Sequence, residues 1–239
     1  MRQTLLNKAS YQPVAAELNI IDIPVDLAAS NAQAIIGEAL ASQPPLRGVI
    51  HAATVIDDKL LAKMDSANLN AVLAPKIAGA GLLHRLTENC QLDFFVLYSS
   101  ATTAFGNPGQ ANYVAANSYL EALSAHRRAN DLPSLCIGWG AIDDVGFLAR
   151  NPALKKSLVA RLGGSALTAA AVIHTLEQAL IGGQQDSSYL ALDWSSLRSL
   201  LPAAQQAKYH YFNRLDNSTQ GHDPSDVRLQ LAAMPIAER

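Results

Sequence analysis

Serine, tyrosine and asparagine side chains follow one another in the segment 98–117, which reads YSSATTAFGNPGQANYVAAN. A tyrosine hydroxyl can donate a proton to a carbonyl oxygen while a neighbouring serine hydroxyl holds that oxygen in place. A tyrosine and a serine of this segment are the candidates for these two roles. The residue types therefore point to acid catalysis at a carbonyl group.

The elements on either side of this segment predict where these hydroxyls meet. The apolar run Phe94–Tyr98 predicts a buried strand, and residues 112–129 predict a helix. The hydroxyls would then lie at the carboxyl end of a strand, where open α/β sheets bind their ligands.

The rest of the chain alternates in the same way. Apolar β-rich runs predict further strands at 19–26, 47–51, 134–138 and 188–192, and the strand that contains Phe94–Tyr98 is expected to span 92–99. Helical spacing predicts helices at 30–41, 65–88 and 168–181. Ser30 is the expected cap of the first helix, and Pro75 is a possible bend in the second. This alternation predicts a Rossmann-like α/β fold, a parallel sheet with helices on both faces.

Composition excludes several other classes of protein. The 239 residues are 49% hydrophobic and 16% charged with a net charge of −2, which favours a globular domain over a disordered or nucleic-acid-binding chain. Cys90 and Cys136 lack metal-type spacing and are expected to be buried thiols. There is no signal peptide and no long apolar run, so a cytoplasmic location is expected.

These motifs resemble the ketoreductase domain of modular polyketide synthases, a branch of the short-chain dehydrogenase/reductase superfamily. The resemblance runs from about residue 19 to residue 201. Its blocks, in chain order, are Gly48–Ala53, Ile56–Asp58, Leu73–Gly79, Ser99–Ser100, Gly109–Asn117 and Trp139–Gly140.

The resemblance implies a set of catalytic roles. Tyr113 would donate the proton, Ser100 would bind the substrate oxygen, Lys76 would supply a cation near the phenol, and Asn117 would orient water or the lysine. The hydride would come from NADPH, and the substrate would be a β-ketoacyl group on the phosphopantetheine arm of an acyl carrier protein. Taken singly, each residue also has an ordinary structural explanation, such as a half-buried tyrosine or a surface lysine.

The resemblance also implies cofactor contacts. Asp26 would meet the adenine ring, and His51, Ala52 and Ala53 would lie beside the adenosine ribose. His51 could equally be a buried core histidine. The family usually continues with glycine where this chain has Thr54, whose branched side chain disfavours a positive φ.

Other matched positions imply control of stereochemistry and substrate. Ile56, Asp57 and Asp58 resemble the Leu-Asp-Asp signature of ketoreductases that form the 3R-hydroxyl product, although both aspartates could simply cap the following helix. The competing type has tryptophan where this chain has Phe105. Gln110 and Trp139 would border the substrate, and Phe147 would line an acyl channel in a lid at about 141–165, unless the apolar residues there only cover the core.

A glycine-rich pyrophosphate loop is missing from the matched part. The first glycine of the sequence is Gly37, so the first β-α-β nucleotide-binding unit is expected to be absent, and residues 1–18 would form the helix before the third strand of the family. We expect residues 1–202 to be a partial ketoreductase domain and 203–239 a polar linker toward a carrier domain. Such a chain would aggregate alone or bind a complementing half or neighbouring synthase domains. An inactive scaffold domain and a reductase of free small molecules are the alternative interpretations.

Overall fold

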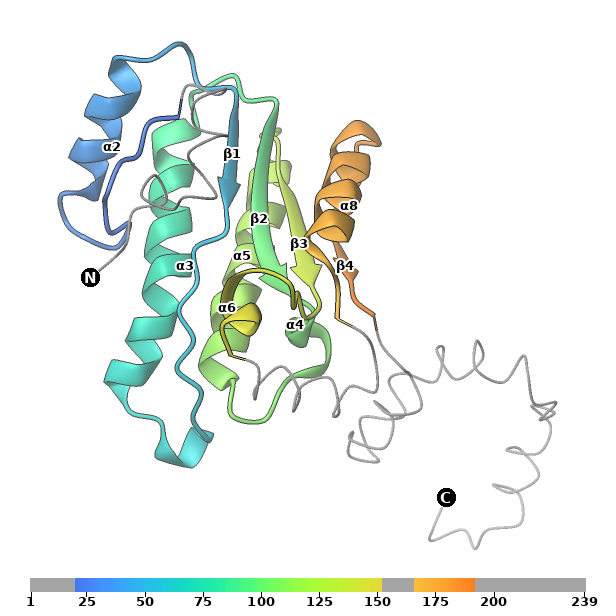
Figure 1. The fold of residues 1–239 in the computed structure, drawn as a ribbon. Helices are drawn as coiled ribbons and strands as arrows, with labels where there is room; N and C mark the ends of the chain where they lie inside the picture. The colour runs from blue at the N-terminus through green and yellow to red at the C-terminus, as the bar shows by residue number, and fades with distance from the viewer. Residues whose placement is uncertain (1–19, 152–165, 192–239) are drawn as a thin grey trace, which may run out of the picture. The chain divides into compact units, whose positions relative to one another are not determined.

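A parallel sheet of four strands forms the centre of the structure, a computed structural model that describes residues 20–151 and 166–191 (Figure 1). The strands are β1 (Gly48–His51), β2 (Phe94–Ser100), β3 (Leu135–Trp139) and β4 (Ser187–Tyr189), and they lie in that order across the sheet. All three pairings are parallel, with Val49 opposite Phe95 and Ser100 opposite Trp139. The predicted α/β class is confirmed.

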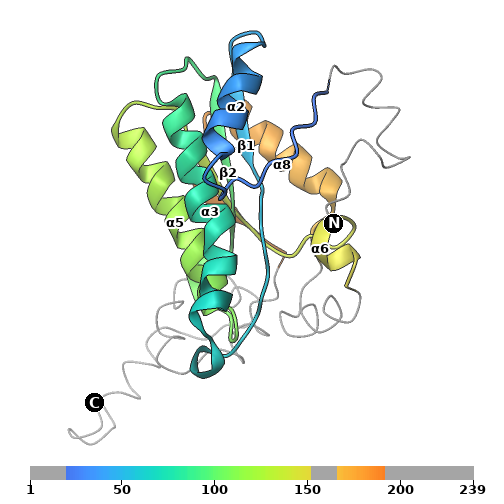
Figure 2. The same ribbon diagram turned by 90° about the vertical axis from the view of Figure 1, so that its left-hand side faces the viewer.

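Helices cover the sheet on both sides. α3 (Ser66–Thr87) and α5 (Ala111–Ala129) lie side by side on one face, while α8 (Ala169–Ile181) lies across the sheet from them, as Figure 2 shows. α2 (Ala32–Ala41) packs on the outer side of α3 through Ile36 and Leu82. Short helical turns complete the described part: η2 (Leu61–Lys63), α4 (Thr102–Phe105) and α6 (Gly146–Ala149).

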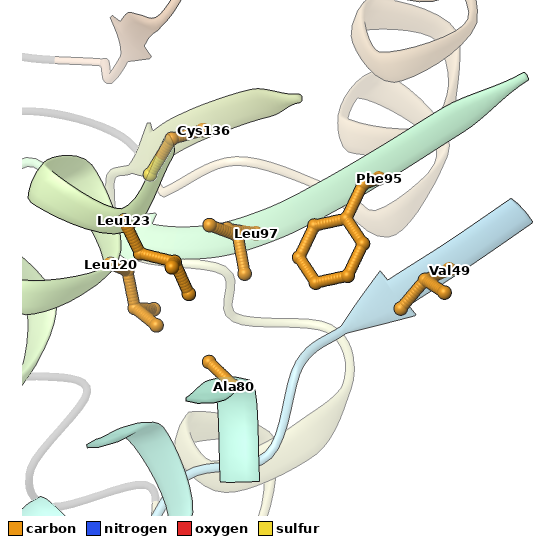
Figure 3. Close-up of a cluster of buried hydrophobic side chains, with 7 residues drawn as sticks. All are labelled: Val49, Ala80, Phe95, Leu97, Leu120, Leu123 and Cys136. Atoms are coloured by element: carbon orange, nitrogen blue, oxygen red, sulfur yellow. The ribbon is translucent and has the colours of Figure 1, made fainter. Parts of the chain in front are cut away.

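The core lies between the sheet and the α3–α5 pair. Figure 3 shows its fully or nearly buried members, which are Val49, Ala80, Phe95, Leu97, Leu120, Leu123 and Cys136. Alternate residues of β2 point to this layer because successive strand side chains face opposite sides of a sheet. Cys136 is a buried free thiol, as predicted, and burial raises its pKa far above the usual range. Cys90 is also a free thiol but is only half-buried, so the predicted burial is wrong for this residue.

Arg127 closes this core at the amino ends of the strands as a fully buried cation. Its guanidinium carbon lies 3.8 Å from the centroid of the Phe95 ring, and its Nε donates to the carbonyl of Pro133 at 3.1 Å. A second guanidinium nitrogen lies 3.0 Å from Nδ1 of His84. These contacts fix the end of α5 against α3 and the strand layer.

Asp65 begins α3 through a capping box. Its carboxylate accepts from the amide of Asn68 at 2.8 Å, and the Asn68 side chain returns to the Asp65 amide. The alternative in which Asp57 and Asp58 cap this helix is therefore wrong, because the helix starts well after them. α3 continues through Pro75.

Most boundaries lie close to the predicted ones, but residues 20–26 are not a strand. A strand is defined by hydrogen bonds to a neighbour, and β1 is the terminal strand of the sheet on that side among the described residues. The β-rich composition of 20–26 gave no information on such a partner. Likewise α2 begins after Asn31 rather than after Ser30.

The chain divides into two compact units. Of the described residues, one unit comprises 20–140 together with Val172–Tyr189, and the other comprises 141–151, 166–171 and 190–191. In the second unit Thr168 Oγ1 accepts from the Ala171 amide and the Asp144 carboxylate accepts from the Ala169 amide, so both cap α8. Within the described ranges, no helix is both long and apolar enough to cross a membrane.

Candidate active site

The carboxyl ends of three adjacent strands bring His51, Ser100 and Trp139 to one edge of the sheet. Ser100 is the last residue of β2 and is 6% exposed. Its hydroxyl lies 2.9 Å from Thr102 Oγ1 and accepts from the Thr102 amide at 3.3 Å, so the following turn holds it. The predicted strand-end position of this serine is confirmed by the fold.

Tyr113 lies in the first turn of α5 and is half-buried. Burial raises the pKa of its phenol, and side-chain hydrogen bonding to Ser100, Asn117 and Thr54 opposes that rise. The phenol is therefore protonated at neutral pH and is held beside the Ser100 hydroxyl. This is the protonation state that a general acid needs.

Thr54 is a site residue whose contribution the sequence analysis missed. It was considered only as an obstacle to a positive φ, yet among the described residues the only non-glycine with a positive φ is Asp131. Thr54 therefore has an ordinary backbone, and its side chain reaches Tyr113. The signal that could have identified Thr54 as a site residue was its position shortly after His51, just beyond the carboxyl end of β1.

Lys76 comes from the middle of α3 and is 2% exposed. Its Nζ donates to the carbonyl of Tyr98 at 2.9 Å and lies 6.0 Å from the centroid of the Tyr113 ring. Burial lowers the pKa of Lys76 to about 8, so the ammonium stays largely protonated at neutral pH. Lys76 is therefore not a surface lysine, which was the alternative interpretation of this residue when it was considered alone.

Asn117 lies one turn after Tyr113 and is completely buried. Its Nδ2 donates to the Tyr113 carbonyl at 2.8 Å, while its Oδ1 has no hydrogen-bond partner in the described part of the chain. A buried acceptor without a partner is costly. Asn117 Oδ1 can therefore accept a hydrogen bond from a donor such as water or an ammonium group.

The acidic pair Asp57–Asp58 lies against the loop that precedes Tyr113. Gln110 donates from Nε2 to Asp58 Oδ2 at 2.8 Å, and Asn112 donates from Nδ2 to the carbonyl of Asp57 at 3.0 Å. Burial raises the pKa of Asp58, the hydrogen bond from Gln110 opposes the rise, and the neighbouring Asp57 adds to it. The structure thus brings together the two segments that the sequence assigned to stereocontrol.

The residues expected to bind the cofactor differ in their burial and do not share one environment. His51 is 2% exposed and lies beneath α3, where a ring nitrogen meets the Pro75 carbonyl and Nε2 has no described partner. Burial, and then the Lys76 charge, lower the pKa of His51 to about 4. Asp26 is exposed and its Oδ1 accepts from the Ala28 amide.

The remaining expected positions differ in exposure. Ala52 is exposed, while Ala53, Ile56 and Phe105 are half-buried. Trp139 is 5% exposed, and its ring centroid lies 5.5 Å from that of Tyr98 and 6.0 Å from that of Tyr189. These three aromatic rings pack together at the end of β3.

The second unit contains the beginning of the expected lid. Phe147 belongs to α6, and Ile142 forms an isolated parallel bridge with Leu167. Residues 152–165 of the lid, the helix expected at 1–18 and the linker expected at 203–239 lie outside the described residues.

The polar groups around Tyr113 fit the nicotinamide–ribose end of a dinucleotide, because they include both a donor and an acceptor. Lys76 is a buried ammonium with one described partner and three N–H groups, and Asn117 Oδ1 is a buried acceptor without one. Both suit sugar hydroxyl groups. For the pyrophosphate, the described residues present no glycine turn between a first strand and a helix.

A parallel sheet with helices on both faces defines a Rossmann-like α/β domain, and Tyr113 and the buried Lys76 lie near the carboxyl ends of its strands. The sequence model of one family, described as "KR domain", matches residues 5–144. The chain therefore belongs to the ketoreductase (KR) domain family of polyketide synthases, and the predicted family is confirmed. It is an oxidoreductase family, and its superfamily uses nicotinamide cofactors.

Curated relatives are large synthases. The chain is 36% identical over 244 residues to polyketide synthase GfsA of Streptomyces halstedii, which covers 97% of this chain and 3% of that protein. It is 35% identical over 194 residues to mycoketide-CoA synthase of Mycobacterium tuberculosis, covering 78% of this chain and 5% of the synthase. A match of 43% over 145 residues to the highly reducing polyketide synthase ALT1 of Alternaria alternata covers 59% of the chain and 5% of that protein.

Solved structures of ketoreductases share the fold. A structure described as an A1-type ketoreductase has a TM-score of 0.75 at 30% identity and covers 83% of this chain and 42% of its own. The first ketoreductase of the tylosin synthase has a TM-score of 0.71 at 29% identity, covering 82% of this chain and 43% of its own. The chain thus spans less than half the length of these ketoreductases and a small part of each synthase.

Proposed function

We propose that this chain carries the catalytic part of a ketoreductase that reduces a β-ketoacyl thioester to the β-hydroxyacyl form. The observation that supports it most is the placement of the buried Lys76 ammonium 6.0 Å from the centroid of the Tyr113 ring. Burial raises the pKa of the Tyr113 phenol, and hydrogen bonding to Ser100 opposes that rise. A buried cation beside a phenol has no evident structural benefit, because its desolvation is costly.

The chemistry requires charge stabilisation at one oxygen. As hydride reaches the carbonyl carbon, negative charge develops on the carbonyl oxygen, and the site must offset it. Ser100 donates a hydrogen bond to that oxygen, and the Tyr113 hydroxyl gives it a proton. The Lys76 ammonium favours the tyrosinate that remains, and Asn117 Oδ1 accepts from a water or from Lys76 during reprotonation.

NADPH is the proposed hydride donor, and it supplies the two electrons of the reduction from its nicotinamide ring. Lys76 would hold the nicotinamide ribose, and Asp26, His51, Ala52 and Ala53 remain the proposed adenosine contacts. The pyrophosphate would be held by a glycine-rich segment outside residues 1–239. We call the protein in which this segment accompanies the chain the complete reductase polypeptide.

An acyl carrier protein is the proposed carrier of the substrate, as the synthase relatives suggest. Residues 1–202 would then be the reductase part, 141–165 its lid with Phe147 toward the acyl chain, and 203–239 the linker. Ile56, Asp57, Asp58, Phe105, Gln110 and Trp139 would border the carbonyl and favour the 3R-hydroxyl product. The proposed location is the cytoplasm.

Among the described residues β1 is a terminal strand of the sheet, and this edge supports a partner segment. Ile50 in β1 is 52% exposed and Ile21 is 51% exposed, although both are large apolar residues. An uncovered edge strand with apolar side chains favours pairing with another strand. The complementing reductase segment is the proposed occupant.

The test is Tyr113→Phe in the complete reductase polypeptide, assayed with a small β-ketoacyl thioester and NADPH. We expect at least a thousandfold loss of kcat, with NADPH affinity unchanged within about threefold. Turnover at the wild-type level in this variant would disprove the role of Tyr113. A wild-type polypeptide that binds NADPH yet reduces no thioester would favour an inactive scaffold domain.

A further inference from the structure

Three side-chain amides, one from α3 and two from the start of α5, hold the dipeptide Asp57–Asp58, and two of them have no role in the reaction proposed above. Asn112 Nδ2 donates to the Asp57 carbonyl at 3.0 Å, and Asn68 Nδ2 donates to Asp57 Oδ2 at 2.5 Å. The third amide, Gln110, donates to Asp58 Oδ2 at 2.8 Å. The dipeptide is therefore fixed by both its backbone and its side chains.

The chemistry of the neighbouring groups determines how the two asparagines are oriented. Asn112 Oδ1 accepts from the amide of Tyr113 at 2.8 Å, and Asn68 Oδ1 accepts from Lys59 Nζ at 2.6 Å. A backbone N–H and an ammonium can only donate, so the amide oxygens must face them. The NH2 groups are thereby directed at Asp57.

Both asparagines are buried, since Asn112 is 1% and Asn68 is 9% exposed. Buried amides stabilise a structure only when their hydrogen bonds are made, so they favour a single geometry over displaced ones. A backbone bond from the Lys59 amide to the Gly109 carbonyl, 2.8 Å long, joins the same two segments. Residues 57–59 are thus attached to the turn that leads directly into Tyr113.

We propose that Asn112 and Asn68 are positioning residues of the reductase, which act through Asp57 to set the Asp57–Asp58 loop relative to Tyr113. They control which face of the carbonyl meets the hydride, because the loop restricts how the acyl chain reaches the tyrosine. This inference rests on the proposed ketoreduction.

Substitution by aspartate separates this role from helix capping. Asn112→Asp keeps the oxygen that accepts from the Tyr113 amide, and the added charge suits the first turn of α5. It removes the donor to Asp57. Asn68→Asp likewise keeps the acceptor for Lys59 and sets a second carboxylate against Asp57. The matched control is Asn70→Asp, the same substitution at an exposed position of α3.

The experiment uses the complete reductase polypeptide with a small β-ketoacyl thioester and NADPH, and the product enantiomers are separated on a chiral column. For Asn112→Asp and Asn68→Asp we expect the share of the minor enantiomer to rise at least fivefold and KM to rise at least threefold. Hydrogen exchange of the segment 55–60 should become at least tenfold faster. Exchange within α5 and all values for Asn70→Asp should stay at the wild-type level.

An active wild type with unchanged enantiomer ratio and KM in both variants would overturn this inference alone. Unchanged exchange at 55–60 would also overturn it, because the amides would then not hold the loop. If the wild type reduced no thioester, the proposed function would fail, and the role of the asparagines in reduction would fail with it.

Discussion

The Nζ atom of Lys76 lies 6.0 Å from the centroid of the Tyr113 ring, although the two residues belong to different helices. The lysine is anchored by its bond to the Tyr98 carbonyl in β2, so strand and helices together set its position. The pair places a desolvated cation beside the phenol that the proposed reaction uses as its acid.

The first prediction concerns the pH dependence of reduction. Burial lowers the pKa of Lys76 to about 8, and the cation is lost as the pH rises through that value. We expect kcat/KM to be constant from about pH 6.5 to 7.5 and to fall above about pH 8. Steady-state kinetics in the complete reductase polypeptide test this. A rate that stays constant to pH 10 would contradict the role of Lys76.

The second prediction is that Lys76→Met stabilises the protein while it removes activity. A shift of the lysine pKa from 10.5 to about 8 corresponds to a cost of about 3 kcal/mol for the buried charge. Loss of the bond to the Tyr98 carbonyl offsets part of this gain. We expect the free energy of unfolding at pH 7 to rise by roughly 1–2 kcal/mol and kcat to fall at least a hundredfold.

Urea unfolding at several pH values provides the control for Lys76→Met. The folded wild type binds fewer protons than the unfolded chain between about pH 8 and 10.5, so its stability should rise with pH there. The advantage of the variant should shrink correspondingly. A destabilised variant with normal kcat would mean that Lys76 is a structural residue.

The third prediction concerns His51 in acid. Its pKa is about 4 in the folded protein and 6.5 in the unfolded chain. The unfolded state therefore binds a proton first as the pH falls, and stability should decrease by about 3 kcal/mol between pH 6.5 and pH 4. The contribution of the neutral His51 side chain to the free energy of unfolding is fully present above pH 6.5.

His51→Gln is the matched variant, because its amide can still donate to the Pro75 carbonyl but does not titrate in this range. Burial also lowers the pKa of His84, so the measured quantity is the difference between the two unfolding curves. That difference should shrink by about 3 kcal/mol from pH 6.5 to pH 4. Parallel curves for wild type and variant would contradict the prediction.

The fourth prediction concerns Gly138, which lies in β3 opposite Ser99. A Cβ at this position would lie 2.5 Å from Ser188 Oγ and 3.3 Å from the carbonyl carbon of Ser100. Gly138→Ala should therefore cost about 1–3 kcal/mol of stability and lower kcat by displacing Ser100. Adding Ser188→Ala should recover part of the stability, and equal stability of Gly138→Ala and wild type would refute the close packing.

The sequence predicted the class of fold well because the signals were local. The apolar run before Ser100 and the helical spacing after Asn112 each depend on neighbouring residues, and both elements form within two residues of the predicted bounds. The segment 20–26 shows the limit of this reasoning, since its β-rich composition could not reveal whether another strand lies beside it.

The order and types of the site residues were likewise determined by the sequence alone. Ser100 and Tyr113 are brought together because a strand and the helix that follows it must meet at the end of a parallel sheet. Residues close in the chain and joined by a short loop have few other arrangements available.

Only the tertiary structure decided which distant residues complete the site. Burial of Lys76, the approach of Thr54 to Tyr113, and the amides of Asn68 and Asn112 on Asp57 all join segments separated along the chain. No periodicity encodes such pairings, because they arise from how helices pack on the sheet and from the requirement that buried polar groups find partners. The sequence thus determined the chemistry that is available, and the packing decided which groups can act on the same oxygen.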